Sequence, residues 1–175
     1  MAPAYEVLVE ASSSRYPGAM TQWLNDDELA SWLPLAGVML RLGPALDSQL
    51  QRDFDLTHFD YLCLAMLSET EERTLPMSEL AGRTNASLSR LSHVVSKLER
   101  RGWVARCPSP ASRRVTLVRL TEEGWDVLVA AAPGHVETVR SLVFDDLDRE
   151  DVAALHRIAG HIVERIEASR LKSTC

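Results

Sequence analysis

Cysteine is scarce in this chain, which holds only Cys63, Cys107 and Cys175. Three cysteines cannot all pair with one another, and their spacing matches no metal-binding motif, so we expect reduced thiols, as in a cytoplasm. The apolar neighbours of Cys63 predict an inert buried thiol. Cys107 follows Arg106 directly, and because a nearby cation lowers the pKa of a thiol, Cys107 is the better candidate for redox chemistry.

Long apolar runs are also missing from the sequence. The longest uninterrupted ones, such as 127–133, fall far short of the roughly 18–20 residues that a membrane span needs. Residues 1–19 lack the basic start and the apolar segment of a secretory signal. We interpret them as a disordered extension, in which only YEVLVE has the composition of a short strand. The expectation is a cytoplasmic protein without a membrane partner.

Arrangements of catalytic residues are likewise absent. No Ser-His-Asp spacing, glycine-rich phosphate loop or pair of carboxylates stands out, so we expect neither an enzyme nor a cofactor. His156 and His161 lie five residues apart, on different faces of a helix. His135 and Glu137 lie close together in the sequence but have no third ligand nearby. These histidines predict solvated or hydrogen-bonded side chains rather than a metal site.

The charge of the chain is segregated. At 175 residues, with 46% hydrophobic and 25% charged side chains, the composition suits one globular domain or two small lobes that share a core. Between residues 76 and 120, nine Lys or Arg face two carboxylates, a balance of +7 in a chain of net charge −6. The other residues hold ten basic and twenty-three acidic side chains, a balance of −13. Such a basic surface favours contact with phosphate backbones, and a solvated face without a partner is the alternative.

Hydrophobic periodicity predicts a mainly α-helical fold with one small β-hairpin wing. Helices are expected to begin at Asp26, after Thr57, at Met77, after Ser87, after Thr121 and after Asp148. We expect a kink or break at 43–44, a bend at 132–135, and a polar linker at 68–76. Two β-branched stretches, 103–107 and 115–120, flank a predicted hairpin loop at 108–114. Short helix, tight turn, second helix and hairpin together are typical of a winged helix-turn-helix lobe.

The predicted helix after Ser87 separates its side chains into two faces. The apolar face comprises Leu88, Leu91, Val94, Val95 and Leu98, and the polar face comprises Ser89, Ser92, His93, Ser96, Lys97 and Arg100. A surface of this kind fits the major groove of DNA, where Arg90 is the candidate for pairing with a guanine edge. Lys97 and Arg100 suit the phosphate backbone better than the bases. At the hairpin, Arg113 and Arg114 suit a narrow minor groove. With Ser87, Ser89, Ser92 and His93, these residues form the predicted DNA-binding set.

The sequence resembles the multiple-antibiotic-resistance regulator (MarR) family of bacterial transcription factors. The resemblance rests on MSELAGRTNASLSRLSHVVSKLERRGWVARC, on the wing SRRVTLVRLTEEG, and on the helical arms, over about residues 25–170. It implies that Arg90, Ser92 and His93 contact DNA from the recognition helix and that Arg113 is the wing arginine. The family pattern has an aspartate before that arginine, whereas this chain has Ser112. The resemblance therefore also predicts a less preorganised wing arginine.

The resemblance further implies a homodimer that binds an inverted repeat and a small aromatic or anionic effector that releases the DNA. Dimerisation also follows from the terminal helices, which are too apolar to be buried within one small monomer. We expect residues 20–56 and 121–172 to form the dimerisation region and residues 57–120 to form the DNA-binding lobe. A two-fold dimer presents its recognition helices about 34–36 Å apart and predicts a palindromic site.

The family's effector cleft would lie near a row of aromatic and sulfur-containing side chains, namely Trp23, Trp32, Met39, His58 and Met66. Core packing is the alternative interpretation of that row. For the chain as a whole, the leading hypothesis is a DNA-binding repressor. The alternative is a dimeric protein-interaction module that keeps the winged-helix fold.

Overall fold

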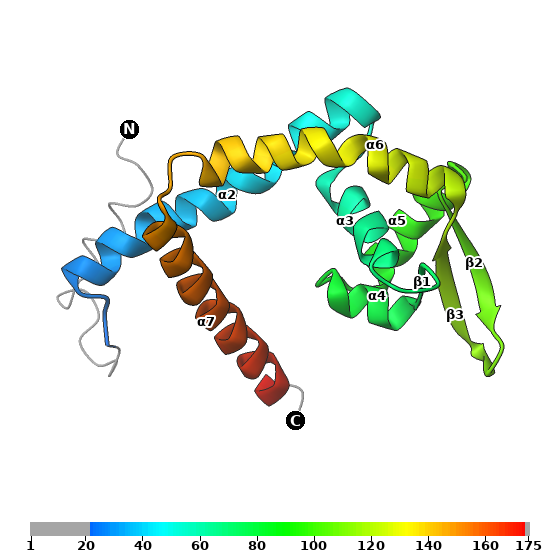
Figure 1. Ribbon diagram of the computed structural model, residues 1–175. Helices are drawn as coiled ribbons and strands as arrows, with labels where there is room; N and C mark the ends of the chain where they lie inside the picture. Colours follow the sequence, from blue (N-terminus) through cyan, green and yellow to red (C-terminus); the bar gives the residue numbers. More distant parts are fainter. Residues whose placement is uncertain (1–21, 174–175) are drawn as a thin grey trace, which may run out of the picture. The chain divides into compact units, whose positions relative to one another are not determined.

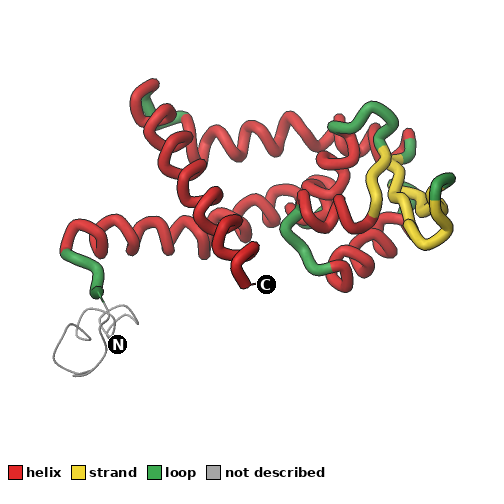
Figure 2. Tube along the Cα trace, turned by 90° about the horizontal axis from the view of Figure 1, so that it is seen from below, coloured by secondary structure: helices red, strands yellow, loops and turns green. Residues whose placement is uncertain are grey.

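The computed structural model describes residues 22–173, which are almost entirely helical apart from one three-stranded sheet (Figures 1 and 2). The extension expected at 1–19 lies outside these residues. The helices are α2 (Asp26–Phe54), α3 (His58–Ser68), α4 (Met77–Arg83), α5 (Leu88–Arg100), α6 (Glu122–Val139), the π-helical turn η1 (Arg140–Phe144) and α7 (Arg149–Ser173). The strands are β1 (Thr74–Pro76), β2 (Val104–Ser109) and β3 (Ser112–Leu120). The chain divides into two units, residues 1–41 and 42–175, with the division inside α2.

Helix α2 continues without interruption through Gly43 and Pro44, so the predicted break does not occur. At its start, the Asn25 side chain accepts a hydrogen bond from the Glu28 amide at 2.9 Å, and the Glu28 carboxylate accepts one from the Asn25 amide at 2.8 Å. This reciprocal cap stabilises the first turn. Pro44 lacks a backbone donor and so removes one hydrogen bond from the helix interior, yet the 29-residue helix continues through it.

Helix α3 begins with the predicted capping box. The Thr57 hydroxyl accepts a hydrogen bond from the Asp60 amide at 3.1 Å, and the Asp60 carboxylate accepts one from the Thr57 amide at 2.8 Å. The segment after α3, predicted to be only a linker, contains strand β1, so this prediction is wrong in part. Leu75 of β1 is buried in the core and pairs with Val118 of β3. Three residues in a polar segment are too few for a recognisable β pattern, and β3 supplies the pairing that forms the strand.

The sheet is antiparallel in the order β1-β3-β2. The hairpin turns at Pro110 and Ala111, so most of the predicted loop at 108–114 belongs to the strands. Pro108 is tolerated in β2 because β2 is an edge strand, and the register shifts at Pro108 and Ser109. The wing is therefore longer and its tip narrower than the sequence predicted.

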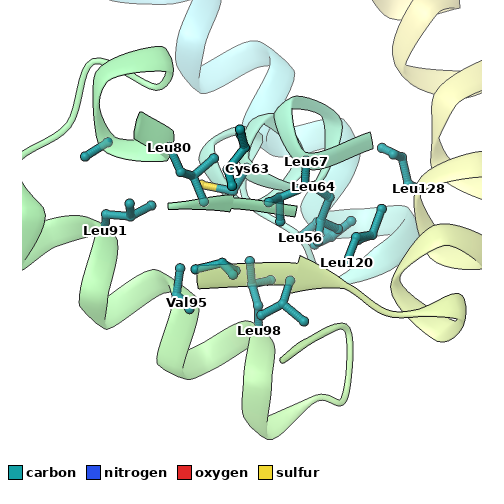
Figure 3. Packing of buried hydrophobic residues seen from close by; sticks show 14 of the residues in the cluster. Leu56, Cys63, Leu64, Leu67, Leu80, Leu91, Val95, Leu98, Leu120 and Leu128 are labelled. Atoms are coloured by element: carbon teal, nitrogen blue, oxygen red, sulfur yellow. The ribbon is translucent and has the colours of Figure 1, made fainter. Parts of the chain in front are cut away.

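The core of the lobe is a cluster of leucine and valine side chains from α3, α4, α5, β3 and α6 (Figure 3). From α5, Leu91, Val95 and Leu98 are fully buried, as predicted, and this burial fixes which face of α5 points outward. Leu88 is 56% exposed, so its prediction as a packed residue is wrong. The reason is that α5 begins one turn before the core does. Cys63 is buried in the same cluster, where burial and Asp60 raise the pKa of its thiol to about 12, consistent with an inert thiol.

The last helices carry much of the exposed apolar surface. Helix α6 continues through Pro133, and the departure from α-helical geometry comes at η1, where the Asp145 amide donates to the Arg140 carbonyl at 2.9 Å. Asp148 caps α7 as predicted, because its Oδ1 accepts from the amides of Glu150 and Asp151, each at 2.8 Å. As expected of terminal helices too apolar to be buried within one monomer, α7 exposes large apolar side chains, namely Val152, Leu155, Ile158, Ile162, Val163 and Ile166.

Two stretches, Asp26–Phe54 and Glu122–Phe144, are long and apolar enough to cross a membrane by length and composition alone. The uninterrupted apolar runs considered above did not predict this, because polar residues are interspersed in both helices. Helices that cover an apolar protein interface have the same composition. The finding is therefore weak support for a membrane span.

Candidate nucleic-acid interface

Helices α4 and α5 form a helix-turn-helix whose second helix is held at both ends. Asn85 adopts a left-handed conformation with φ of 52° in the turn, and Ser87 caps α5 by accepting from the Arg90 amide at 3.2 Å. At the other end, Gly102 has a φ of 77°, the left-handed conformation that glycine commonly adopts directly after a helix. The short connection and the two caps fix where the outward face of α5 begins and ends.

The predicted DNA-contacting residues of α5 share one exposed face. Ser87, Ser89, Arg90, Ser92, His93 and Arg100 are all exposed. The guanidinium of Arg90 also lies over the ring of Phe59, with Cζ 4.3 Å from the ring centroid. This cation–π contact orients the guanidinium at the end of the side chain, and Arg90 as a whole stays exposed. Contact with DNA stays a prediction for each of these residues.

Lys97 has a structural contact that the sequence did not predict. Its Nζ lies 2.5 Å from Oδ2 of Asp60, a carboxylate that is 1% exposed. The Asp60 carboxylate thus caps α3 and pairs with α5 at the same time. Asp60 lies 37 positions before Lys97, so helical spacing gives no signal for the pair. Binding of Lys97 to phosphate stays a prediction, but its charge is already shared with Asp60.

Other cations of the basic window are also paired. Arg101 forms an ion pair with Asp55, outside the window, and donates to the Asp55 carbonyl at 2.8 Å. Arg83 pairs with Glu79 at 2.8 Å. The balance of +7 therefore overstates the available positive charge. Among the side chains described in this window, the cations without a carboxylate partner are Arg90, Arg100, Arg114 and Arg119.

Arg106 joins the wing to α5. Its guanidinium donates to the Glu99 carboxylate at 2.8 Å, to the Ser92 carbonyl at 2.9 Å and to the Ser96 hydroxyl at 3.0 Å. The backbone amide of Arg106 also donates to Glu99 at 3.1 Å. These four contacts, which we name the Arg106 clamp, connect strand β2 to the middle of the recognition helix. From the sequence, Arg106 is recognisable only as a cation next to Cys107, because its partners lie 7 to 14 positions away.

The tip of the wing is organised by serines. The Ser109 hydroxyl accepts from the Ala111 amide at 3.3 Å, and the Ser112 hydroxyl accepts from the Arg114 amide at 3.4 Å. Arg114 is exposed, as a wing contact requires, and follows the turn at the start of β3. Arg113 also lies in β3, but its side chain is outside the described ones. The role of Ser112 in wing preorganisation stays a prediction.

The residues of the predicted effector cleft lie in different surroundings. His58 is half-buried, and its ring stacks on His135 at 5.5 Å, next to Tyr61 at 4.3 Å from His135. Burial, followed by the charge of His58, lowers the pKa of His135. Met66 packs against the core of the lobe, which favours the alternative interpretation at that position. Trp23, Trp32 and Met39 lie in the N-terminal unit and are exposed.

The structure also shows the surroundings of two minor candidates, the Cys107 thiol and a metal site. Cys107 is half-buried in β2 and free of a disulfide. Across residues 22–173, no group of three His, Cys, Asp or Glu side chains is arranged to hold a metal ion.

A helix-turn-helix followed by a two-stranded wing defines a winged helix-turn-helix protein. The MarR family model matches residues 56–116. Two solved structures from Streptomyces coelicolor, both MarR family transcriptional regulators, are similar over most of the chain. Sco3205, in complex with DNA, is 40% identical over 82% of this chain and 90% of its own, with a TM-score of 0.80. AbsC is 36% identical over 85% of this chain and 99% of its own, with a TM-score of 0.80.

A curated relative is matched over a shorter span. YdcH of Bacillus subtilis, an uncharacterized HTH-type transcriptional regulator, is 33% identical over 85 residues, which are 46% of this chain and 56% of that protein. The match thus spans little more than half of that relative. Together with the two structures, it shows that the chain belongs to the MarR family of transcriptional regulators, as the sequence resemblance predicted.

Proposed function

We propose that this protein is a homodimeric repressor that binds an inverted-repeat operator in double-stranded DNA in the cytoplasm. One observation carries the proposal. Within the basic window, the described cations that lack a carboxylate partner lie only on α5 and β3, the two elements that a winged-helix protein presents to DNA. The 40% identical Sco3205, crystallised in complex with DNA, supports the same function.

The residues divide into two roles in this proposal. Arg90 reads a guanine edge, and Ser89, Ser92 and His93 contact neighbouring bases or phosphates. Ser87, Lys97 and Arg100 contact the backbone and set the position of α5. Arg113 and Arg114 enter or flank the minor groove, where positive charge is favoured.

The homodimer is supported by where the apolar surface lies. Among the described residues, all but two of the exposed large hydrophobic side chains lie outside the predicted lobe, before α2 or on α2, α6, η1 and α7. An exposed apolar area of this extent is typical of an interface. A second copy of the chain is the partner that gives a two-fold arrangement of recognition helices and hence an inverted repeat.

Effector release is a further part of the proposal. The rings of His58, Tyr61 and His135, between α3 and α6, offer stacking contacts that suit a small aromatic molecule. Benzoate is a suitable probe. If this part is correct, saturating benzoate weakens operator binding by the wild type and has less effect on a Tyr61→Ala variant.

The central experiment is selection of random duplex DNA on the full chain at about 150 mM salt, a physiological ionic strength. We compare the wild type with Arg90→Ala and with Arg52→Ala, whose exposed arginine lies on α2 beside Asp53. The wild type and Arg52→Ala should enrich the same inverted repeat, and Arg90→Ala should lose it. For each tenfold rise in salt concentration, the association constant for that repeat should fall by about 0.9 logarithmic units per phosphate contact.

The result that contradicts the proposal is the absence of any enriched motif in the wild type. In that case the rival function, a dimeric protein-interaction module with the same fold, becomes the better interpretation. A reporter promoter that carries the recovered repeat then tests the direction of regulation, because a repressor lowers its output.

A further inference from the structure

The predicted lobe, residues 57–120, exposes two large apolar side chains among those described. Leu88 is 56% exposed and Val115 is 37% exposed. Single exposed apolar residues are ordinary on protein surfaces, so exposure alone says little. Their location is informative, because Leu88 begins α5 and Val115 lies in β3, the two elements that carry the unpaired arginines.

Leu88 lies where a recognition helix first meets the bases. It is the first residue of α5, directly after the capping Ser87 and in the same turn as Ser89 and Arg90. Residues at the N-terminal end of such a helix contact base edges in the major groove. The cap from Ser87 to the Arg90 amide holds this first turn in place. Leu88 and Arg90 flank Ser89, each about 100° from it around the helix, so a pose that turns Ser89 toward the bases places Leu88 and Arg90 on either side of it.

The chemistry of the groove identifies what a leucine can read. Hydrogen-bond donors and acceptors cover most of the major-groove edge of each base pair, and the 5-methyl group of thymine is its apolar feature. A leucine side chain gains by burial against that methyl group and offers nothing to the polar edges of the other bases. Arg90 and the serines recognise polar groups, so Leu88 adds a different kind of discrimination to the same turn.

We propose that Leu88 is a specificity-determining residue that packs against a thymine methyl group in each half-site. The inference rests on the proposed function, because it requires a specific DNA complex. Leu88 and Arg90 are two residues apart on a helix that rises 1.5 Å per residue. Because the two side chains leave the helix on opposite sides of Ser89, the thymine lies on the other side of Ser89 from the guanine that Arg90 reads.

The test removes single methyl groups from the DNA. Each thymine of the selected operator is replaced in turn by deoxyuridine, symmetrically in both half-sites, and the affinity is measured for the wild type, Leu88→Ala and Val115→Ala. One symmetric pair should weaken wild-type binding by about three- to fivefold per half-site, the amount expected for one buried methyl group. Leu88→Ala should bind the unmodified operator more weakly and lose sensitivity to that replacement alone. Val115→Ala, a matched truncation on the wing, should keep it.

Two outcomes overturn the inference while the proposed function stands: no thymine replacement affects the wild type, or every sensitivity persists unchanged in Leu88→Ala. If the wild type selects no operator at all, the proposed function itself fails, which is a separate result. Thermal melting of Leu88→Ala confirms that the variant is folded, since removal of a side chain that is more than half exposed should change the melting temperature little.

Discussion

At the scale of the residue, the pair of Lys97 and Asp60 links a candidate DNA-contacting cation at the surface to a buried carboxylate that must be neutralised. The two side chains are unequal, because 36% of the lysine side chain is exposed while the carboxylate is buried. A buried carboxylate is strongly destabilising unless it is paired and hydrogen-bonded. The stability of the pair therefore depends mainly on satisfying Asp60.

We expect Lys97→Met to lower the free energy of unfolding more than Asp60→Asn does. The first variant leaves a buried carboxylate whose remaining hydrogen bond is from the Thr57 amide, a loss of about 2–3 kcal/mol once the exposure of the lysine is allowed for. In the second, the asparagine still accepts from Thr57 and the lysine turns to solvent, a loss of about 1 kcal/mol. Urea unfolding at neutral pH measures both values, and the reverse order would contradict this account.

His135 is the second residue with a measurable consequence. Its buried Nδ1 has no hydrogen-bond partner among residues 22–173, and burial together with His58 lowers the pKa of the side chain. Because the folded-state pKa is lowered, the unfolded chain binds the proton more tightly. The stabilising contribution of neutral His135 is therefore complete above the unfolded pKa of about 6.5 and is lost as the pH falls through the lowered folded pKa.

We expect the stability of the wild type to fall between about pH 7 and pH 5 and that of His135→Gln to fall less. His156→Gln, on the exposed face of α7, is the matched control and should behave as the wild type does. Denaturant midpoints at several pH values give the comparison. Parallel curves for the wild type and His135→Gln would contradict the assignment.

At the scale of the element, the Arg106 clamp sets the direction of the wing relative to the recognition helix. A hairpin of two strands has few contacts of its own and moves readily unless something holds it. In this protein, the hydrogen bonds from Arg106 to Glu99, Ser92 and Ser96 restrain β2 against α5. Such preorganisation reduces the ordering that DNA binding would otherwise require.

We expect Arg106→Ala to speed amide hydrogen exchange in β2 and β3 and to weaken operator binding by about three- to tenfold. The double variant Glu99→Arg with Arg106→Glu reverses the pair and should recover part of both effects. That recovery separates a positioning role from the loss of one positive charge. Unchanged exchange in the wing of Arg106→Ala would show that the clamp does not hold it.

The elements that the sequence predicted well are those specified by local signals. The caps at Thr57, Ser87, Thr121 and Asp148 depend on residues a few positions apart, and each is present. Strand β1 was missed because its pairing with β3 lies far away in the sequence. The length of the hairpin was underestimated for the same reason, since pairing between strands overrides the weak β propensity of proline and serine.

At the scale of the whole molecule, the difference between sequence and structure is clearest in the charge. Counting residues in the window 76–120 correctly located the basic region but overstated its strength. Asp55 and Asp60 lie outside the window and neutralise Arg101 and Lys97. Pairs so distant in sequence are brought together by the packing of α3 and α5, which no local count includes. The four arginines that lack a carboxylate partner form a smaller and better-defined set of candidates for contact with DNA.

The contacts of α5 with the segment 55–60 have a consequence for protein engineering. Arg90, Lys97 and Arg101 each rest on that segment, at Phe59, Asp60 and Asp55. A recognition helix grafted alone onto another scaffold would carry three cations away from the groups that orient them. The portable unit of specificity in this protein is therefore the continuous stretch from residue 55 to the end of β3, which also carries the wing arginines. A chimera designed with that boundary keeps the helix and its anchors together.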